Sequence, residues 1–301
     1  MKYIITATVL LALSSFVLSS NAAEGVEQKK EIKFISYNAY WGMKSDESKG
    51  KQRFIEWAKK QDADVIAWQE MNHFTREKLE KFAHSYGHKY AVLLKEPKNP
   101  NDEEFFPTAI TSKHPIINVT KLTDNLWHGA LFAEVGPYHF VVTHMNPFRT
   151  SQRIDEINLI LDSIKYSTSP DGKWIIAGDL NSFSPLDKKG YDEEEMIKNL
   201  KSKEKERPVL KNLVNGKMDY TVQQNILSRG YVDVLKLKYP DEFVATAPTK
   251  IFYDQSQTPL RYDYIYVSKN MKDDVVDVRI LKDSFTDKYS DHYPVQMIIK
   301  N

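Results

Sequence analysis

Short runs of apolar residues, separated by polar turns, make up most of the chain from residue 31 onward. Many of them alternate apolar with polar positions or are rich in β-branched and aromatic residues, which is the pattern of β-strands. They predict strands over residues 31–38, 64–70, 90–95, 108–112, 116–122, 129–135, 138–145, 173–179, 231–237, 262–267, 275–281 and 295–300.

Segments with apolar residues three or four positions apart lie between some of these strands. This spacing predicts helices over residues 51–60, 75–86 and 219–230, the last ending at Gly230. A further helix begins at Thr150 or Ser151, either of which can cap it. Its apolar face consists of Ile154, Ile157, Leu161 and Ile164.

Two polar segments interrupt the pattern. Residues 96–107 are rich in Pro, Asn and acids and predict a loop. Residues 186–217 are dense in charge, which is typical of a solvated and partly helical insertion. A plain surface loop is the simpler interpretation of this insertion and the one we favour.

The order of these elements predicts the fold class. The strands between residues 108 and 145 follow one another through short connections, which favours antiparallel pairing. The mixture of hairpins and helices predicts an α/β protein with two sheets packed together and helices outside. No repeat or change of composition divides the chain, so we expect a single domain over residues 23–301 that carries the charged insertion.

The first residues have the features of a secretory signal peptide. Met1-Lys2-Tyr3 is a short basic start, residues 4–18 are mostly apolar, and small residues precede a cleavage site near Ala22 or Ala23. The apolar run is short and broken by serines, which argues against a membrane anchor. We therefore expect export of residues 23–301 to a periplasmic or secreted location, with no stable membrane insertion.

Composition narrows the chemistry. The 301 residues include no cysteine, which excludes disulfides, thiolate metal sites and a cysteine nucleophile. The formal charge of +1 falls to zero without residues 1–22, because that segment contains Lys2 and no acid. A neutral chain lacks the net positive charge of a module that binds nucleic acid tightly and nonspecifically. An enzyme that binds its substrate only transiently does not need this charge.

Polar residues stand at the ends of several predicted strands. Asn38, Glu70, Asp179, Asn181 and Asp291 carry the carboxylate and amide oxygens that Mg²⁺ and Mn²⁺ prefer. If alternation continues along the strand, Asp179 and Asn181 point the same way. Asp263 lies on an apolar strand face, where a carboxylate needs a partner. His292 is the candidate partner, since a carboxylate can fix the tautomer of an imidazole and raise its basicity.

Six motifs occur in one order along the chain. They are Phe34-Ile35-Ser36-Tyr37-Asn38, Trp68-Gln69-Glu70, Val142-Thr143-His144, Ile176-Ala177-Gly178-Asp179-Leu180-Asn181, Arg261-Tyr262-Asp263-Tyr264-Ile265 and Ser290-Asp291-His292. This order resembles the endonuclease/exonuclease/phosphatase superfamily, which includes deoxyribonucleases, abasic-site endonucleases, neutral sphingomyelinases and inositol polyphosphate 5-phosphatases. The resemblance implies a four-layer α/β sandwich of two packed mixed sheets flanked by helices.

The resemblance also implies a role for each motif residue. Glu70 is the expected ligand of Mg²⁺ or Mn²⁺, with Asn38 and Asp291 helping directly or through water. Asp179 orients or deprotonates the attacking water. Asn181 positions the water or the phosphate. His292, oriented by Asp263, contacts the phosphate, and His144 assists at the phosphate or the leaving group. Tyr40 and His144 differ from the residues that abasic-site enzymes carry there, which argues against abasic-site repair.

These observations predict a metal-dependent phosphoester hydrolase, most simply a nuclease-like phosphodiesterase that acts as a monomer and has nucleic acid among its candidate substrates. The alternative substrates are phospholipid head groups or small phosphoesters, and a binding protein that has lost the chemistry is a third hypothesis. The sequence leaves open whether Arg149 and Arg153 bind phosphate, and whether Trp41, Trp127 and Phe148 stack on substrate or belong to the core. The remaining histidines, at positions 73, 84, 88, 114, 128 and 139, are expected to be surface or structural residues.

Overall fold

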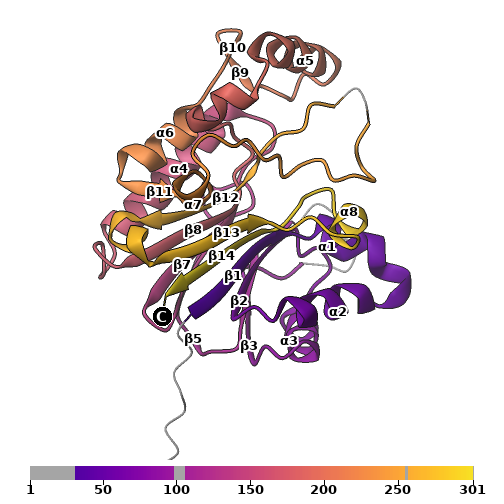
Figure 1. Ribbon diagram of the computed structural model, residues 1–301, viewed down its shortest axis with the longest axis vertical. Helices are drawn as coiled ribbons and strands as arrows, with labels where there is room; N and C mark the ends of the chain where they lie inside the picture. The colour runs from indigo at the N-terminus through magenta and orange to yellow at the C-terminus, as the bar shows by residue number, and fades with distance from the viewer. Residues whose placement is uncertain (1–30, 98–105, 255–256, 301) are drawn as a thin grey trace, which may run out of the picture.

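Two six-stranded β-sheets form the centre of the molecule in a computed structural model (Figure 1). The structure describes residues 31–97, 106–254 and 257–300. The predicted signal peptide with its cleavage site, and most of the predicted loop at residues 96–107, lie outside these residues. No helix in the described ranges is both long and apolar enough to cross a lipid bilayer.

The first sheet has the strand order β13-β14-β1-β2-β4-β3. Its strands are β13 (Val275–Ile280), β14 (Val295–Lys300), β1 (Glu31–Asn38), β2 (Val65–Gln69), β4 (Ala109–Ser112) and β3 (Tyr90–Leu93). β1 and β2 are parallel, because the chain crosses back between them through α1 (Tyr40–Met43), η1 (Lys44–Lys49) and α2 (Gln52–Gln61). The other neighbours pair antiparallel.

The second sheet repeats this plan with the order β11-β12-β8-β7-β6-β5. Its strands are β11 (Tyr231–Asp233), β12 (Asp263–Ser268), β8 (Lys173–Asp179), β7 (Tyr138–His144), β6 (Ala130–Val135) and β5 (Ile116–Leu122). β7 and β8 are its parallel pair, connected by α4 (Thr150–Lys165). Both sheets are therefore mixed, as predicted.

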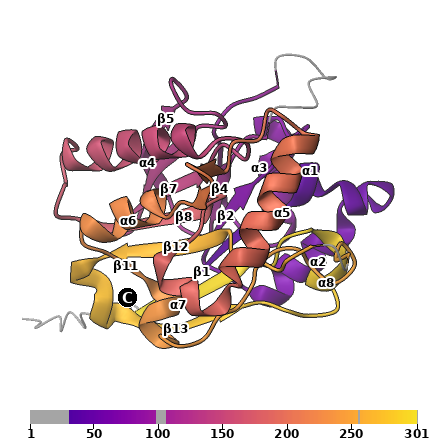
Figure 2. The ribbon, with the colours of Figure 1, turned by 90° about the horizontal axis from the view of Figure 1, so that it is seen from above.

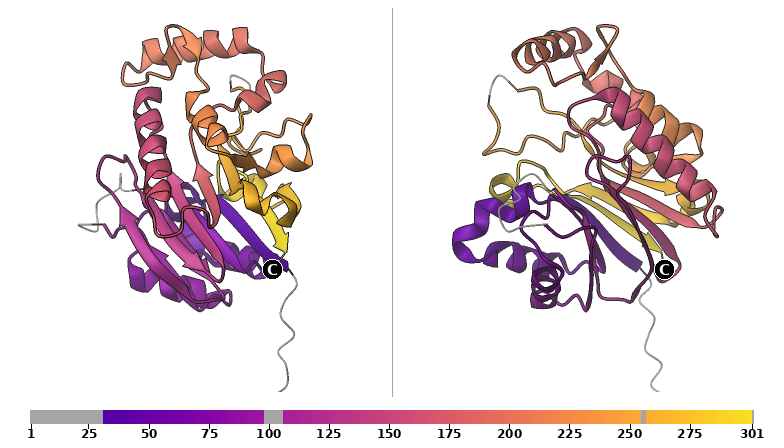
Figure 3. Two further views of the ribbon diagram at one scale, coloured as in Figure 1. Left: turned by 90° about the vertical axis from the view of Figure 1, so that its left-hand side faces the viewer. Right: turned by 180° about the vertical axis from the view of Figure 1, so that it is seen from behind.

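Helices cover the outer faces of both sheets, which gives four layers (Figure 3). In β1, Phe34 faces the core between the sheets, whereas Ile35 and Tyr37 pack under the outer helices α2 and α3 (Arg76–Ser85). α4 and α6 (Thr221–Ser228) cover the second sheet in the same way. Strands buried on both faces explain why the central runs are almost continuously apolar. The predicted α/β sandwich is confirmed.

The charged insertion is more ordered than a plain surface loop. It contains η2 (Pro185–Gly190), α5 (Glu193–Glu206) and a hairpin of β9 (Leu213–Val214) and β10 (Lys217–Met218). Asp192 caps α5 by accepting a hydrogen bond from the Glu195 amide. A small apolar cluster packs the buried face of α5 against neighbouring segments. It consists of Phe183, Met196, Leu200, Met218, Tyr220 and Leu260. The segment is thus partly helical, and the favoured loop interpretation is wrong.

The strand predicted over residues 231–237 is correct only in its first half. β11 ends at Asp233, whose carboxylate accepts hydrogen bonds from the Leu235 and Lys236 amides and starts α7 (Val234–Lys238). The same carboxylate pairs with the fully buried Arg261, which also contacts Asp187 at 2.7 Å. This buried network joins the insertion, α7 and the start of β12. The remaining short helices are η3 (Lys269–Asp274) and α8 (Thr286–Tyr289).

Candidate active site

The carboxyl ends of the parallel pairs meet at one edge between the sheets. Asn38 ends β1, Glu70 follows β2, His144 ends β7 and Asp179 ends β8. Asp179 lies opposite His144 on one neighbouring strand and opposite Asp263 on the other. Parallel strands end at the same edge of a sheet, so residues distant in sequence come together there. Asp179 is the centre of the group.

Two glycines allow this close approach. Gly178 has φ +143°, and a Cβ there would lie 1.8 Å from the Thr143 carbonyl oxygen on β7. Gly42, with φ +68°, would place a Cβ 2.0 Å from the Asn72 oxygen, and its amide donates a hydrogen bond to the Glu70 carbonyl. Only glycine fits at either point. The two tight contacts hold Asp179 and Glu70 at the ends of their strands.

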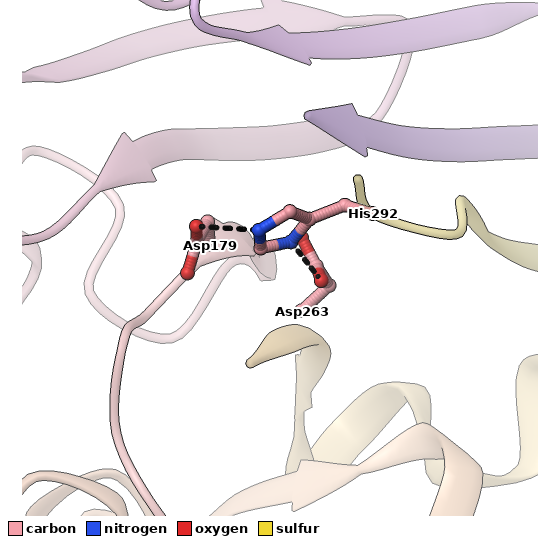
Figure 4. A group of neighbouring side chains, drawn as sticks. All are labelled: Asp179, Asp263 and His292. Atoms are coloured by element: carbon pink, nitrogen blue, oxygen red, sulfur yellow. Dashed lines mark hydrogen bonds and ion pairs between the residues drawn. The ribbon is translucent and has the colours of Figure 1, made fainter. Parts of the chain in front are cut away.

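His292 lies between two aspartates (Figure 4). Its Nδ1 is 2.7 Å from Asp263 Oδ2, and its Nε2 is 3.8 Å from Asp179 Oδ2. Burial by itself lowers the pKa of His292, but the charges of Asp263, Asp179 and Asp291 outweigh burial and hold that pKa well above its usual value. The imidazole is therefore a charged donor, and the predicted pairing of Asp263 with His292 is present.

Asp179 is almost fully buried and highly connected. It accepts hydrogen bonds from the Asn181 amide at 2.9 Å and from Asn38 Nδ2 at 3.2 Å. Burial, followed by the charges of Asp263 and Glu70, raises its pKa to about 8 against the opposing effect of His292. Such a carboxylate can accept a proton near neutral pH.

Glu70 lies in a left-handed conformation, with φ 57°, just beyond β2. Its carboxylate accepts hydrogen bonds from the Trp41 amide at 2.9 Å and from Asn38 Nδ2 at 3.0 Å. Asn38 thus bridges Glu70 and Asp179, while its own oxygen accepts the Tyr40 amide. In this arrangement Asn38 positions two carboxylates. Its predicted contact with a metal ion stays a prediction.

The residues around Glu70 and Asp291 fit a divalent cation. Burial, followed by the charge of Asp291, raises the pKa of Glu70 to about 7. Asp291 Oδ1 is enclosed and has no hydrogen-bond partner among the described residues. Asp179, Asp263 and His292 also have ligand atoms within 4.8 Å of one another, but Asp263 and His292 already satisfy each other. Asp291 Oδ1, which lacks a partner, and the Glu70 carboxylate, whose charge is repelled by that of Asp291, are the better match to Mg²⁺ or Mn²⁺.

One predicted detail differs in the structure, and one open question is answered by it. β8 ends at Asp179 and Asn181 has φ 46°, so strand alternation does not extend to Asn181. Its side-chain amide donates to the Met145 carbonyl at 3.1 Å, close to the site but tied to the backbone. Arg153 is buried and bonded to Asn146, Thr150 and Asn212, which makes it a structural residue, whereas Arg149 is exposed.

His128 is a residue of this site that the sequence interpretation missed. Its ring stacks on that of His144, with centroids 4.3 Å apart. Burial lowers the pKa of His128 to about 3. Burial also holds the pKa of His144 well below its usual value, and positive charge on the neighbouring His128 or His292 would lower it further. His144 Nε2 is 3.5 Å from Asp179 Oδ2. No local pattern marked His128, since it lies in the loop between β5 and β6 and its partner His144 ends β7.

The sequence profile of the Endonuclease/Exonuclease/phosphatase family matches residues 35–292, and the chain belongs to this family. The family hydrolyses phosphoester bonds. Comparison with curated protein sequences gives no match. An AP endonuclease from Archaeoglobus fulgidus has a similar structure, with TM-score 0.65 and 17% identity over 89% of this chain and 99% of that one. AP endonuclease LMAP from Leishmania major aligns with TM-score 0.62 and 16% identity, over 90% and 88% of the respective chains.

Proposed function

We propose that the protein is an exported phosphodiesterase of the nuclease type that depends on Mg²⁺ or Mn²⁺. The observation that carries this proposal is the position of Asp179. It lies between His144 and His292 and is linked to Glu70 through Asn38, on the edge where the two sheets end. One point is then surrounded by a base, a cationic hydrogen-bond donor, a neutral hydrogen-bond donor and ligands for a divalent cation. Phosphoester hydrolysis requires these kinds of group.

The side chains divide the work by protonation state. Asp179 in its deprotonated form takes a proton from the attacking water, because its raised pKa makes the carboxylate a stronger base than a free one. The water oxygen bonds to phosphorus as the bond from phosphorus to the leaving oxygen breaks. His292, held as an imidazolium by Asp263, donates to a phosphoryl oxygen as negative charge develops there. His144 is neutral and offers a hydrogen bond to the phosphate or the leaving group.

Glu70 and Asp291 would hold the divalent cation, and Asn38 would keep the Glu70 carboxylate oriented. When bound, the cation supplies positive charge that polarises the phosphate. The chain itself contributes a buried site in which these charges are already oriented, so little reorganisation accompanies the reaction.

A substrate panel with and without EDTA tests this function. Plasmid DNA, RNA, sphingomyelin, bis-p-nitrophenyl phosphate and inositol phosphates cover the nuclease, lipid and small-phosphoester hypotheses. We expect cleavage of a nucleic acid, loss of activity with EDTA and recovery with Mg²⁺.

Variants of the same protein test the residue roles. Glu70→Ala, Asp179→Ala and His292→Ala should each lower turnover by about 10²-fold or more. Lys205→Ala on the exposed face of α5 is the matched control and should have no effect. Activity that survives chelation, or near-normal activity in all three site variants, would contradict the proposal.

A further inference from the structure

A cavity of about 310 Å³ opens beside Glu70 and His144. Most of its lining residues carry aromatic or imidazole rings, and Glu70 and His144 are the two residues of the candidate active site among them. Its lining also includes Trp41, Phe106, Trp127, His128, Pro147, Phe148 and Arg207. Trp127 is half exposed, so its ring is accessible to a ligand. We call this cavity the aromatic pocket.

The aromatic pocket is held in shape by a buried acid. Glu156 accepts the Trp127 amide at 2.6 Å and the Asn146 amide at 2.9 Å. Asn146 Oδ1 in turn accepts the Phe148 amide at 2.7 Å. Glu156 is thus the common anchor of two loops whose rings, Trp127 and Phe148, pack edge to face with centroids 5.6 Å apart, so the pocket is formed before a ligand arrives.

The charged insertion is fastened to the same wall. The Lys211 amide donates to the Phe148 carbonyl at 2.7 Å, and the Thr150 amide donates to the Lys211 carbonyl at 3.0 Å. Arg153 also donates to the Asn212 side chain. Figure 2 looks down on α5, which crosses above the middle of the molecule. The insertion therefore borders the site.

α5 supplies a cation on each side of the catalytic group. Arg207, directly after α5, lines the aromatic pocket, whereas Lys203 lines a second cavity of about 280 Å³ beside Asp291 and His292. Four helical positions correspond to about 6 Å along the axis. Neither cation has an ion-pair partner in the described part of the chain. Both are available to anions that flank the reacting phosphate.

We propose that the aromatic pocket binds an unpaired nucleobase next to the scissile phosphate, with Lys203 and Arg207 on neighbouring phosphates, so that the substrate is single-stranded nucleic acid. This inference rests on the proposed hydrolytic function. Stacking rings combined with a cationic track are the means by which proteins hold single strands. A duplex keeps its bases stacked inside, and a phospholipid offers flexible chains with one phosphate.

Binding measurements separate this subsite from catalysis. In an Asp179→Asn background that removes turnover, fluorescence anisotropy compares labelled hexathymidylate with a base-free deoxyribose-phosphate hexamer. Trp127→Ala should weaken hexathymidylate binding about tenfold and leave base-free binding unchanged. Arg207→Ala should weaken both ligands alike, because it contacts phosphate. Tyr166→Ala and Lys205→Ala, exposed residues outside both cavities, are the matched controls and should change neither.

The inference is overturned if Trp127→Ala leaves hexathymidylate binding unchanged or weakens both ligands equally. Binding to phosphatidylcholine–sphingomyelin vesicles that depends on Trp127 would also overturn it, in favour of a lipid substrate. Turnover is then measured in the protein with Asp179 intact. Base-dependent binding without cleavage of the single strand would leave the subsite standing and overturn the proposed hydrolysis alone.

Discussion

Buried histidines in the described part of the chain adopt two protonation states, charged and neutral, and the surroundings of each ring determine which one it adopts. Asp263 and two further acids keep His292 charged. His128 and His144 stack in a buried setting that keeps both neutral. His88 is also buried, but its ring lies between Thr111 Oγ1 and the Ala63 carbonyl, far along the sequence from any predicted site residue. The same residue type therefore lies both in the candidate active site and in the packed interior.

His88 should make the folded state sensitive to acid. Burial lowers the pKa of His88 from 6.5 to about 4. Between these two pH values, His88 is therefore protonated in the unfolded chain but stays neutral in the folded protein. Stability is then lost as pH falls from about 6.5 toward 4, by ~2 kcal/mol at pH 4.5. Urea unfolding at pH 7.0 and 4.5 measures this loss. His88→Gln should reduce it relative to the unmodified protein, and an equal loss in both would refute the role of His88.

Individual residues of the candidate active site could be predicted from the sequence where they directly follow or end a predicted strand. Asn38, Glu70 and Asp179 stand at the ends of apolar runs, and the structure brings them together. His128 was not predictable, because its contact with His144 depends on how the loop between β5 and β6 packs against the end of β7. Asn181 was placed by strand alternation, which fails once the chain turns left-handed directly after β8.

At the scale of elements, the position of the site depends on how closely β7 and β8 approach. Gly178 permits this approach, since a side chain there would meet the Thr143 carbonyl. The buried Arg261 network acts from the other side and fixes the start of β12, two residues before Asp263. Neighbouring strands therefore position the reactive groups as a unit.

Gly178→Ala should disrupt this unit. The new methyl group would force β7 and β8 apart, which we expect to cost about 3 kcal/mol of unfolding free energy and to lower turnover as well. Gly136→Ala is the matched control. It also has positive φ, at 58°, but no atom lies within 4 Å of the new Cβ, so only about 1 kcal/mol should be lost. Equal losses in the two variants, measured by urea unfolding, would argue against the steric explanation.

Elements were predictable from local pattern, but their partners were not. The spacing of apolar residues along the chain predicted the bounds of nearly all strands and helices of the two sheets to within a few residues of their observed bounds. α7 was missed because the apolar residues in the range 231–237 are typical of a strand. The helix begins there because the Asp233 side chain caps it. The order of strands in each sheet depends on long-range packing, which one sequence does not encode in any short segment.

Over the whole molecule, a chain of almost zero net charge concentrates acid in one buried place. Glu70, Asp179, Asp263 and Asp291 converge on the edge between the sheets, with His292 as the facing cation. Burying like charges lowers stability unless a partner compensates them. The architecture therefore carries an electrostatic strain that a bound cation would relieve.

Mg²⁺ should consequently stabilise the folded protein without any substrate. A ligand that binds only the folded state raises stability with its concentration, and saturating Mg²⁺ should raise Tm by about 5 °C. Glu70→Gln should abolish this shift and raise Tm in EDTA, because the amide removes one of the repelling charges. Glu206→Gln, an exposed acid at the end of α5, is the control and should retain the full shift. Differential scanning calorimetry in EDTA and in Mg²⁺ makes the comparison, and an undiminished shift in Glu70→Gln would place the cation elsewhere.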